Sequence, residues 1–335
     1  MKFRTIPDIK KSNFTIDYTS NIFSIGSCFT IHIGEKLDYY KFPVLINPFG
    51  TLYNPVSVKK ALEIIINKQI FRKEDLNEYN GKYFSFYHDT TFSDTDIDKA
   101  LEKINRSVEK SHKFLKNTNL LFITFGTSHV YRYLKNKTIV SNCHKIPASK
   151  FERVLLSPED IITPWKTFTD HIRQFNEDIK IVFTVSPVRH LKDGAVMNQL
   201  SKSILLYSIH ELIKTTDNAE YFPSYEIFMD DLRDYRFYAE DMVHAGTSGI
   251  NYVWEKFKDT YISDSELPLM KSIQKIISAS QHKPFNSTDI EYKKFLTTQL
   301  EKIEDMKKQY PHINLQKEKI FFKNQLEKNF GNNHS

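Results

Sequence analysis

The chain has 335 residues, 40% of them hydrophobic and 14% aromatic, which is enough to bury a sizeable core in one large domain or two ordinary ones. Its 47 basic and 41 acidic residues give a formal charge of +6 and are spread along the whole chain. This composition excludes a disordered protein, and the lack of a concentrated basic run argues against binding of nucleic acid.

The N-terminal part of the chain alternates short apolar runs with segments of helical spacing. Gly26 ends the first apolar run, after which Phe29 and Ile33 begin a helical pattern. The pair Asn47-Pro48 ends the second run. We expect, in order, an extended arm over 1–20, a strand over 22–25, a helix to about 40, a strand over 42–46 and a helix over 55–69.

The middle of the chain predicts two hairpins around a central strand. Residues 72–93 are polar and aromatic and contain the turn pair Asn80-Gly81, which is typical of an inserted β-hairpin. Asp94 is expected to cap a helix that runs to about 115. The nearly unbroken apolar run at 120–125 predicts a central strand, and the segments 130–133 and 138–140 predict a second hairpin.

The next part of the chain continues the alternation. Ser157 followed by Pro158 is typical of a helix start. Up to residue 260 we expect a helix to about 176, a strand over 179–185, a helix over 198–214, a strand over 219–229 and a helix over 248–260. This order predicts a three-layer α/β/α sandwich on a mainly parallel sheet. Its binding site should lie beyond the carboxyl ends of the strands, where Gly26, Gly50, Gly126 and Ser186 meet.

Residues 261–335 differ in composition from the rest and are rich in Lys and Glu. One long helix is expected over 287–310, with an apolar stripe suited to docking on the main domain or on a partner. The stripe consists of Ile290, Phe295, Leu296, Leu300 and Ile303. We therefore divide the chain into a domain over 1–260 and a helical C-terminal extension with a polar tail over 261–335.

The termini and cysteines bear on the compartment in which the protein works. No apolar segment follows the basic N-terminus, and no stretch approaches the about eighteen apolar residues of a membrane span. The two cysteines, Cys28 and Cys143, rule out a disulfide-built scaffold and fit free thiols in a reducing compartment. We expect a cytoplasmic protein.

The turn Gly26-Ser27-Cys28 joins the first predicted strand to the first helix. Side chains there face unpaired amides and the positive end of the helix dipole, which partly activate an oxygen or sulfur nucleophile. The alternative is a tight turn with Ser27 as the helix cap and Cys28 as a buried thiol. The turn is therefore a candidate site of chemistry.

Five short blocks occur in one order along the chain: GSCF at 26–29, NPFGTLYNP at 47–55, NCHKIP at 142–147, SPVRH at 186–190 and DMVH at 241–244. Together they resemble the GSCFA family, a bacterial group related to the SGNH/GDSL hydrolases. Such a series is far more specific than any one block. The resemblance implies an SGNH-hydrolase-like fold and leaves the substrate open.

The first and last blocks supply a nucleophile and a base. Relatives usually have Gly-Asp-Ser-Leu in the first block, so an ungapped match places Cys28, rather than Ser27, at the nucleophilic position. Asp241 stands three residues before His244, a spacing that lets the carboxylate accept from Nδ1–H and leaves Nε2 as base. Both nucleophiles remain candidates. An inert Cys28 and a surface salt bridge at Asp241 are the structural alternatives.

The second and third blocks bear on the oxyanion that forms during acyl transfer. The backbone N–H groups of Cys28 and Gly50 are the expected donors, although Gly50 also fits a plain turn glycine. The third block of the relatives, Gly-x-Asn-Asp, is not one of the five blocks above and corresponds here to Gly126-Thr127-Ser128-His129. Here Ser128 offers a hydroxyl where the Asn amide is expected.

Other polar residues after predicted strands complete the candidate pocket. Asn142, His144, Arg189 and His190 are expected to face it, with Arg189 either binding a carboxylate or phosphate or forming a structural ion pair. Cys143 and His144 are adjacent and lack the spacing of zinc ligands, so no metal is expected. The chain has neither a Walker loop nor a GxGxxG motif, and we expect no cofactor.

These residues favour an esterase-like acyl hydrolase that acts on an O-acyl substrate, with an acetylated carbohydrate as one candidate. Two other functions remain open. The same residues serve an O-acyltransferase when an alcohol, rather than water, resolves the acyl-enzyme. The missing Asn of the third block also fits a non-catalytic module that binds an acylated sugar or a partner protein.

Overall fold

A computed structural model describes residues 4–330 and divides them into two compact units. The α/β unit comprises the chain up to Ser12 together with Asn21–Lys36 and Val44–Thr260. The helical unit comprises Asn13–Ser20, Leu37–Pro43 and the chain from Tyr261 onward. All the candidate site residues predicted from the sequence belong to the α/β unit.

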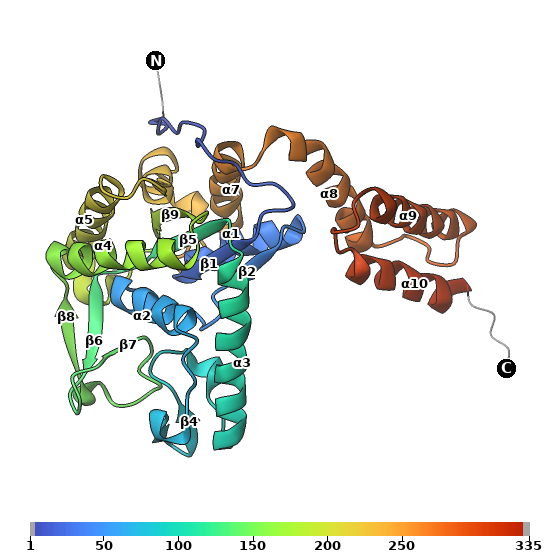
Figure 1. The fold of residues 1–335 in the computed structure, drawn as a ribbon. Coiled ribbons are helices and arrows are strands. Elements are labelled where there is room, and N and C mark those ends of the chain that lie inside the picture. Colours follow the sequence, from blue (N-terminus) through green and yellow to red (C-terminus); the bar gives the residue numbers. More distant parts are fainter. Residues whose placement is uncertain (1–3, 331–335) are drawn as a thin grey trace. The chain divides into compact units, whose positions relative to one another are not determined.

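The α/β unit is built on a parallel sheet whose strands follow the order β10-β9-β5-β1-β2 (Figure 1). The central strands β1 and β5 are buried along their whole length. The order reverses between β1 and β5, and sheets of this kind bind ligands at that reversal. The strands are β1 (Ile22–Gly26), β2 (Val44–Ile46), β5 (Leu120–Phe125), β9 (Lys180–Val185) and β10 (Ala219–Tyr221).

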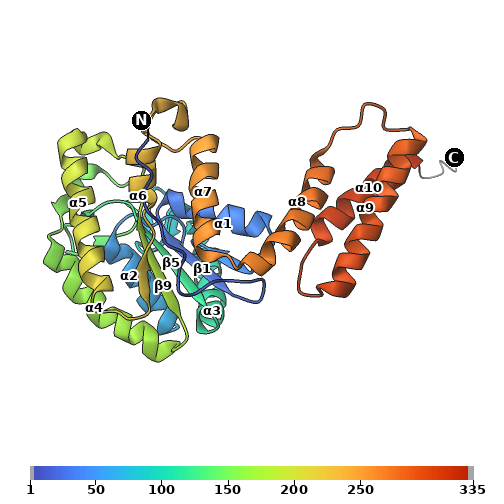
Figure 2. The same cartoon turned by 90° about the horizontal axis from the view of Figure 1, so that it is seen from above.

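Helices cover both faces of this sheet, as Figure 2 shows from above. On one face, Phe122 of β5 meets Phe257 of α7 with ring centroids 5.4 Å apart. On the other, Phe125 and Phe183 meet Trp165 of α4 at 5.2 and 5.6 Å. The predicted three-layer α/β/α architecture is thereby confirmed. Its helices are α1 (Cys28–Tyr39), α2 (Pro55–Ile66), α3 (Ile97–Lys116), α4 (Pro158–Phe175), α5 (Gly194–Ile213) and α7 (Thr247–Tyr261).

Two small antiparallel sheets are inserted between these elements. The first is the hairpin β3 (Asn77–Tyr79) and β4 (Lys82–Phe84), whose turn residues Asn80 and Gly81 both have positive φ, as the sequence predicted. The second has the order β7-β6-β8. Its predicted hairpin is present, and its third strand was missed; the strands are β6 (His129–Tyr133), β7 (Ile139–Val140) and β8 (Phe151–Leu155).

The predicted strand over 219–229 is wrong beyond Tyr221. The segment Ser224–Glu226 (α6) is helical, and Ile227–Asp231 continues it with wider π-type turns. The Ser224 hydroxyl donates to the carbonyl of Val185 at 2.8 Å, which anchors the chain at the end of β9. Side chain to backbone bonding of this kind competes with a sheet ladder.

The helical unit contains α8 (Leu267–Gln281), α9 (Ile290–Gln309) and α10 (Gln316–Phe330), which pack on one another. Only α9 was predicted. Leu296 and Ile303 of its stripe are buried, whereas Ile290 is exposed. Within residues 4–330, no helix combines the length and apolarity needed to cross a membrane.

Candidate active site

The turn between β1 and α1 is fixed by close contact with the neighbouring strand. Gly26 has φ +139°, and a Cβ atom there would lie 2.1 Å from the carbonyl oxygen of Thr124 in β5. The Ser27 N–H donates to that same oxygen at 3.0 Å. Only glycine fits this conformation at this approach. The turn therefore holds Cys28, the first residue of α1, at the reversal of the sheet order.

The two candidate nucleophiles differ in accessibility. Ser27 is 1% exposed, and its hydroxyl is buried without a hydrogen-bond partner within residues 4–330. Cys28 is a free thiol of intermediate exposure. As the first helical residue, Cys28 has a backbone N–H with no acceptor in its own helix. Cys28 is the side chain of the turn that a substrate can reach.

The environment of Cys28 acts on its acidity in two directions. Burial raises the pKa of the thiol, while the positive charge of Lys202 and the backbone N–H groups of Phe29 and Cys28 itself lower it. The net shift is upward. The resting side chain is therefore the thiol, and attack on a carbonyl needs a base to remove its proton.

Backbone hydrogen bonds join the loops that follow β1, β2 and β5. The Gly26 N–H donates to the Asn47 side-chain oxygen at 2.8 Å. The N–H groups of Gly126 and Thr127 donate to the Tyr53 carbonyl at 2.8 and 2.9 Å. The loops after β1, β2 and β5, which include the blocks GSCF and NPFGTLYNP and the turn at Gly126, thus meet at the carboxyl edge of the sheet, as predicted.

Lys202 of α5 lies buried beneath these loops. It is 1% exposed, and its ammonium group donates to the carbonyl oxygens of Gly126 and Ser186, each at 2.6 Å. Burial lowers its pKa to about 7, against a raising effect of Cys28. A buried lysine without a carboxylate partner is costly for a fold. The sequence analysis missed this residue, although it lies on the same apolar helix stripe as Leu205.

The last sequence block forms the predicted pair. His244 Nδ1 donates to Asp241 Oδ2 at 2.6 Å, while Asp241 Oδ1 accepts the backbone N–H groups of Val243 and His244 at 3.0 and 2.9 Å. These bonds lower the pKa of Asp241 to about 2. The His244 side chain is 45% exposed. The carboxylate therefore fixes the ring through Nδ1 and leaves Nε2 accessible.

Two other histidines lie within electrostatic reach of His244. Burial lowers the pKa of His32, and His244 lowers it further. His32 stands four residues after Cys28 on α1, so the two side chains share one face of the helix. Burial also lowers the pKa of His190 to about 4, with smaller contributions from Lys202 and His244. His244 thus acts electrostatically on one residue of the α1 face that carries Cys28.

A cavity of about 360 Å³ adjoins this group. Its lining includes Tyr53, Asn54, Thr127, Asn142 and His190. Tyr53 meets His190 edge to face at 5.5 Å between ring centroids. Burial raises the pKa of Tyr53, and the charge of Cys28 contributes to the shift. His190 thus lines the cavity, and so does Tyr53, on which the charge of Cys28 acts; Tyr53 and Asn54 were missed as site residues.

Gly50 and Ser128 do not have the roles expected of them. The Gly50 N–H donates to the Asn47 carbonyl at 2.8 Å, and a Cβ atom at Gly50 would lie 2.0 Å from the Asp89 carboxylate. Gly50 is therefore a turn glycine whose amide is already paired. Ser128 is fully buried, and its N–H and hydroxyl bond to Ser201 at 2.8 and 3.0 Å. Neither group is available to an oxyanion.

Three of the residues expected to line the pocket lie in different places in the structure. Asn142 lines the cavity, and its side-chain oxygen accepts the His144 N–H at 2.8 Å. His144 is 7% exposed, with Nε2 at 3.0 Å from the Ser85 carbonyl, and is a structural histidine. Arg189 lines a different cavity, beside Phe228 and Met242. Of these three, only Asn142 faces the candidate pocket, together with His190, the fourth residue expected there.

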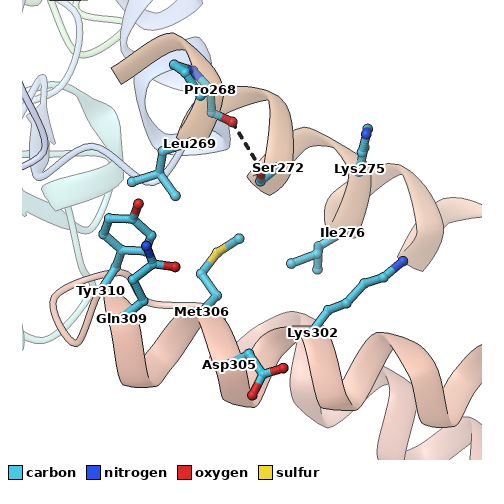
Figure 3. A pocket seen from close by; sticks show the side chains of 10 residues that line it. All are labelled: Pro268, Leu269, Ser272, Lys275, Ile276, Lys302, Asp305, Met306, Gln309 and Tyr310. Carbon is cyan, nitrogen blue, oxygen red and sulfur yellow. Dashed lines mark hydrogen bonds between the residues drawn. The ribbon is translucent and has the colours of Figure 1, made fainter. Parts of the chain in front are cut away.

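The helical unit has a cavity of its own, of about 450 Å³, between α8 and α9 (Figure 3). Figure 3 shows Leu269, Ile276 and Met306 directed toward it, with Lys302 and Asp305 at its side. It contains no thiol, histidine or acid–base pair, and we assign it no chemistry. Among the described residues, no cluster of three or more His, Cys, Asp or Glu side chains is arranged to hold a metal ion.

Comparison with known proteins gives one clear relationship. The model of the GSCFA family matches residues 21–257, and that of the C-terminal domain of GSCFA domain proteins matches residues 273–328. Among curated proteins, no sequence matches this chain.

Several chains of solved structures match this chain, and one of them is weakly similar to it. It is an acetyl xylan esterase from the rumen bacterium Butyrivibrio proteoclasticus, with a TM-score of 0.37 and 8% sequence identity over 73% of this chain and 63% of that protein. This chain thus spans less than two thirds of the esterase's length. A likeness this weak carries no argument about activity.

Proposed function

The chain belongs to the GSCFA family, and from this premise we propose that it is an esterase-like acyl hydrolase in which Cys28, His244 and Asp241 perform the chemistry. The observation that carries the proposal is the 2.6 Å bond from His244 Nδ1 to Asp241, which leaves Nε2 of a half-exposed imidazole accessible. The reachable thiol of Cys28 at the reversal of the sheet order is the nucleophile.

The proposed reaction has two stages. The Cys28 sulfur attacks the ester carbonyl carbon while His244 Nε2 takes the thiol proton. The tetrahedral intermediate collapses, the alcohol leaves with that proton, and the acyl group remains on Cys28 as a thioester. Water then attacks the thioester as His244 removes a proton from it, and the acid departs from a regenerated thiol.

Other residues support these steps. Because the Gly50 amide is already paired, we assign the role of oxyanion donors to the Cys28 N–H and the Asn54 side-chain amide. The Asn54 oxygen accepts the Ser57 N–H at 2.8 Å, which fixes the orientation of its amide. The cavity, with Tyr53 and several polar side chains, suits a small polar ester such as an O-acylated sugar.

The same site serves an O-acyltransferase if a sugar hydroxyl reaches the thioester before water does. The cavity lined by Tyr53, on which the charge of Cys28 acts, is the observation that favours this second candidate. The two are distinguished by following the breakdown of 4-nitrophenyl acetate with and without free sugars. Turnover without an acceptor supports the hydrolase, and turnover that requires one supports the transferase.

The same ester assay tests the nucleophile. Cys28→Ala should abolish the release of 4-nitrophenol, whereas Ser27→Ala, a matched change at the neighbouring position, should retain most of it. Retained activity in Cys28→Ala would contradict the proposed role of Cys28. If no variant and no acceptor supports turnover, the non-catalytic alternative gains support.

A further inference from the structure

The cavity beside the candidate active site carries positive charge at one end. Its lining includes Arg153 and Lys192, and no acidic residue is among the side chains that line it. Both cations approach one aromatic ring, that of Tyr131. The centre of this ring lies 4.8 Å from the guanidinium carbon of Arg153 and 5.3 Å from the Lys192 ammonium. The aromatic face attracts each cation, while the two cations repel each other.

Only one of these cations has a carboxylate partner within residues 4–330. Arg153 forms a salt bridge with Asp193. Lys192 donates instead to the Tyr131 hydroxyl at 2.8 Å and forms no salt bridge among the described residues. The charge of Lys192 lowers the pKa of Asp193 at longer range, without a hydrogen bond between the two. One positive charge therefore remains in excess at the end of the cavity.

The rest of the lining offers neutral hydrogen-bonding groups. Burial lowers the pKa values of His129 and His190, so both rings are neutral near pH 7. Thr127 and Asn142 add a hydroxyl and an amide. A volume of about 360 Å³ suits a small molecule rather than a peptide or a nucleic acid. The cavity is thus polar, aromatic and cationic at one end, and adjoins Cys28 through Tyr53.

We propose that this cavity binds an oxyanion group, a carboxylate or a phosphate, with Lys192 as the charged contact and Tyr131 holding the lysine in place. The identity of the ligand as a substrate rests on the proposed function. The substrate is then an acyl ester whose non-reacting end carries the anion while its carbonyl lies at Cys28. A bound anion neutralises the charge of Lys192 in the way that Asp193 neutralises the charge of Arg153.

Binding is measured first, in the Cys28→Ala variant, so that no chemistry is required. The probes are benzoate, phenyl phosphate and the neutral benzamide, followed by titration calorimetry or ligand-observed NMR. We expect both anions to bind about tenfold or more tightly than benzamide, with an affinity that falls as salt is added. The tighter of the two anions identifies the oxyanion as carboxylate or phosphate.

A matched pair of lysine variants locates the contact. Lys192 is exposed, so Lys192→Met should fold, and it should lose most of the preference for the anions. Lys150→Met removes the same charge from an exposed position outside the cavity and should keep the preference. Equal binding of anions and benzamide, no binding of any probe, or equal losses in the two variants would overturn the proposal.

A second experiment tests whether the cavity contributes to turnover in the wild-type protein. Acetate esters of 4-hydroxybenzoate and 4-hydroxybenzamide differ only in the charge of the remote group. We expect the charged ester to have the higher kcat/KM and Lys192→Met to reduce the ratio by about tenfold. Anion binding without turnover of either ester would reject the proposed hydrolase and keep the anion site; equal kcat/KM values would reject the anion as a substrate feature.

Discussion

Two histidine regions of the α/β unit start from similar sequence patterns and have opposite surroundings. In the block NCHKIP, His144 is 7% exposed, and its Nε2 lies 3.0 and 3.1 Å from the carbonyls of Ser85 and His88. Its ring stacks on Phe84 at 4.1 Å. In the block DMVH, the side chain of His244 is 45% exposed, and its bond to Asp241 uses only Nδ1.

The difference shows what a histidine needs in order to work as a base. Carbonyl oxygens accept hydrogen bonds from Nε2–H of His144, so the nitrogen that must exchange protons is occupied inside the protein. A carboxylate holds Nδ1 of His244 and stabilises the charged ring while Nε2 faces outward. His144 therefore contributes to folding, and His244 is suited to chemistry.

The largest expected effect is the loss of activity on replacing His244. His244→Ala removes the proton carrier from an exposed loop, so ester turnover should fall about a thousandfold or more while the melting temperature stays nearly unchanged. Asp241→Asn serves as the graded control and should lose as much or less, because Asp241 acts through the imidazole. Full activity in His244→Ala, or a large drop in its melting temperature, would show that His244 has a structural role like that of His144.

Replacing His144 should have the reverse outcome. His144→Ala leaves the carbonyls of Ser85 and His88 without that donor and removes the ring stacked on Phe84. We expect a loss of about 2–3 kcal/mol in the free energy of unfolding, measured by urea denaturation, with activity retained by the folded fraction. An unchanged unfolding curve together with lost turnover would show that His144 acts at the site after all.

The buried region also predicts sensitivity to acid. His88 is 0% exposed, its ring stacks on Phe49 at 4.0 Å, and burial lowers its pKa from 6.5 to about 3. Because the unfolded state takes up this proton first, the contribution to stability is complete above pH 6.5 and is lost as the pH falls toward 3. The loss is about 1.4 kcal/mol per pH unit in that range.

Urea unfolding at a series of pH values measures this loss. His88→Gln has no group that titrates in the range and should flatten the profile, although other groups such as His190 keep part of the slope. A wild-type stability that is constant between pH 6.5 and 4 would contradict a buried neutral His88.

The smallest expected effect concerns Lys202, which links the buried region to the reactive one. Its positive charge lowers the pKa of Cys28 against the larger effect of burial. Lys202→Met should therefore raise that pKa further and slow alkylation of Cys28 by iodoacetamide at pH 6, where Lys202 carries its charge, by up to about tenfold. Cys143 is the internal control, because burial raises the pKa of its thiol and the charges that lower it are those of Lys192 and Arg153. Equal slowing at both thiols would indicate a general loosening of the fold.

Most of the sheet could be predicted because its central strands are continuous apolar runs bounded by turn residues. The strand expected over 120–125 matches β5, and Gly26 marked the end of β1. Strand β8 has two adjacent charged residues, Glu152 and Arg153, in place of an alternating or continuous apolar pattern, so neither the strand nor its partner β6 was recognised. Helix α8 carried a signal at helical spacing, Leu269, Ile273 and Ile276, that was overlooked.

The site was predictable where its chemistry lies within a few residues. The bond between Asp241 and His244 follows from their spacing, and the turn at Gly26 from a strand that runs into a helix. Lys202 reaches the site through tertiary folding and belongs to no local motif, whereas Tyr53 and Asn54 stand in the block NPFGTLYNP, of which only Gly50 was assigned a role. Conversely, Ser128 and His144 follow strands as predicted, but nothing local reveals that their polar atoms bond inward.

The most direct test of the account is to find the acyl group on Cys28. The protein is mixed with 4-nitrophenyl acetate, quenched in acid, digested and mapped by mass spectrometry. We predict one acetyl group on the peptide that contains Cys28, attached through a thioester that hydroxylamine removes, and a much lower yield in His244→Ala. An acetyl group on Ser27 in hydroxylamine-resistant ester form, or equal labelling in wild type and His244→Ala, would contradict the proposed mechanism.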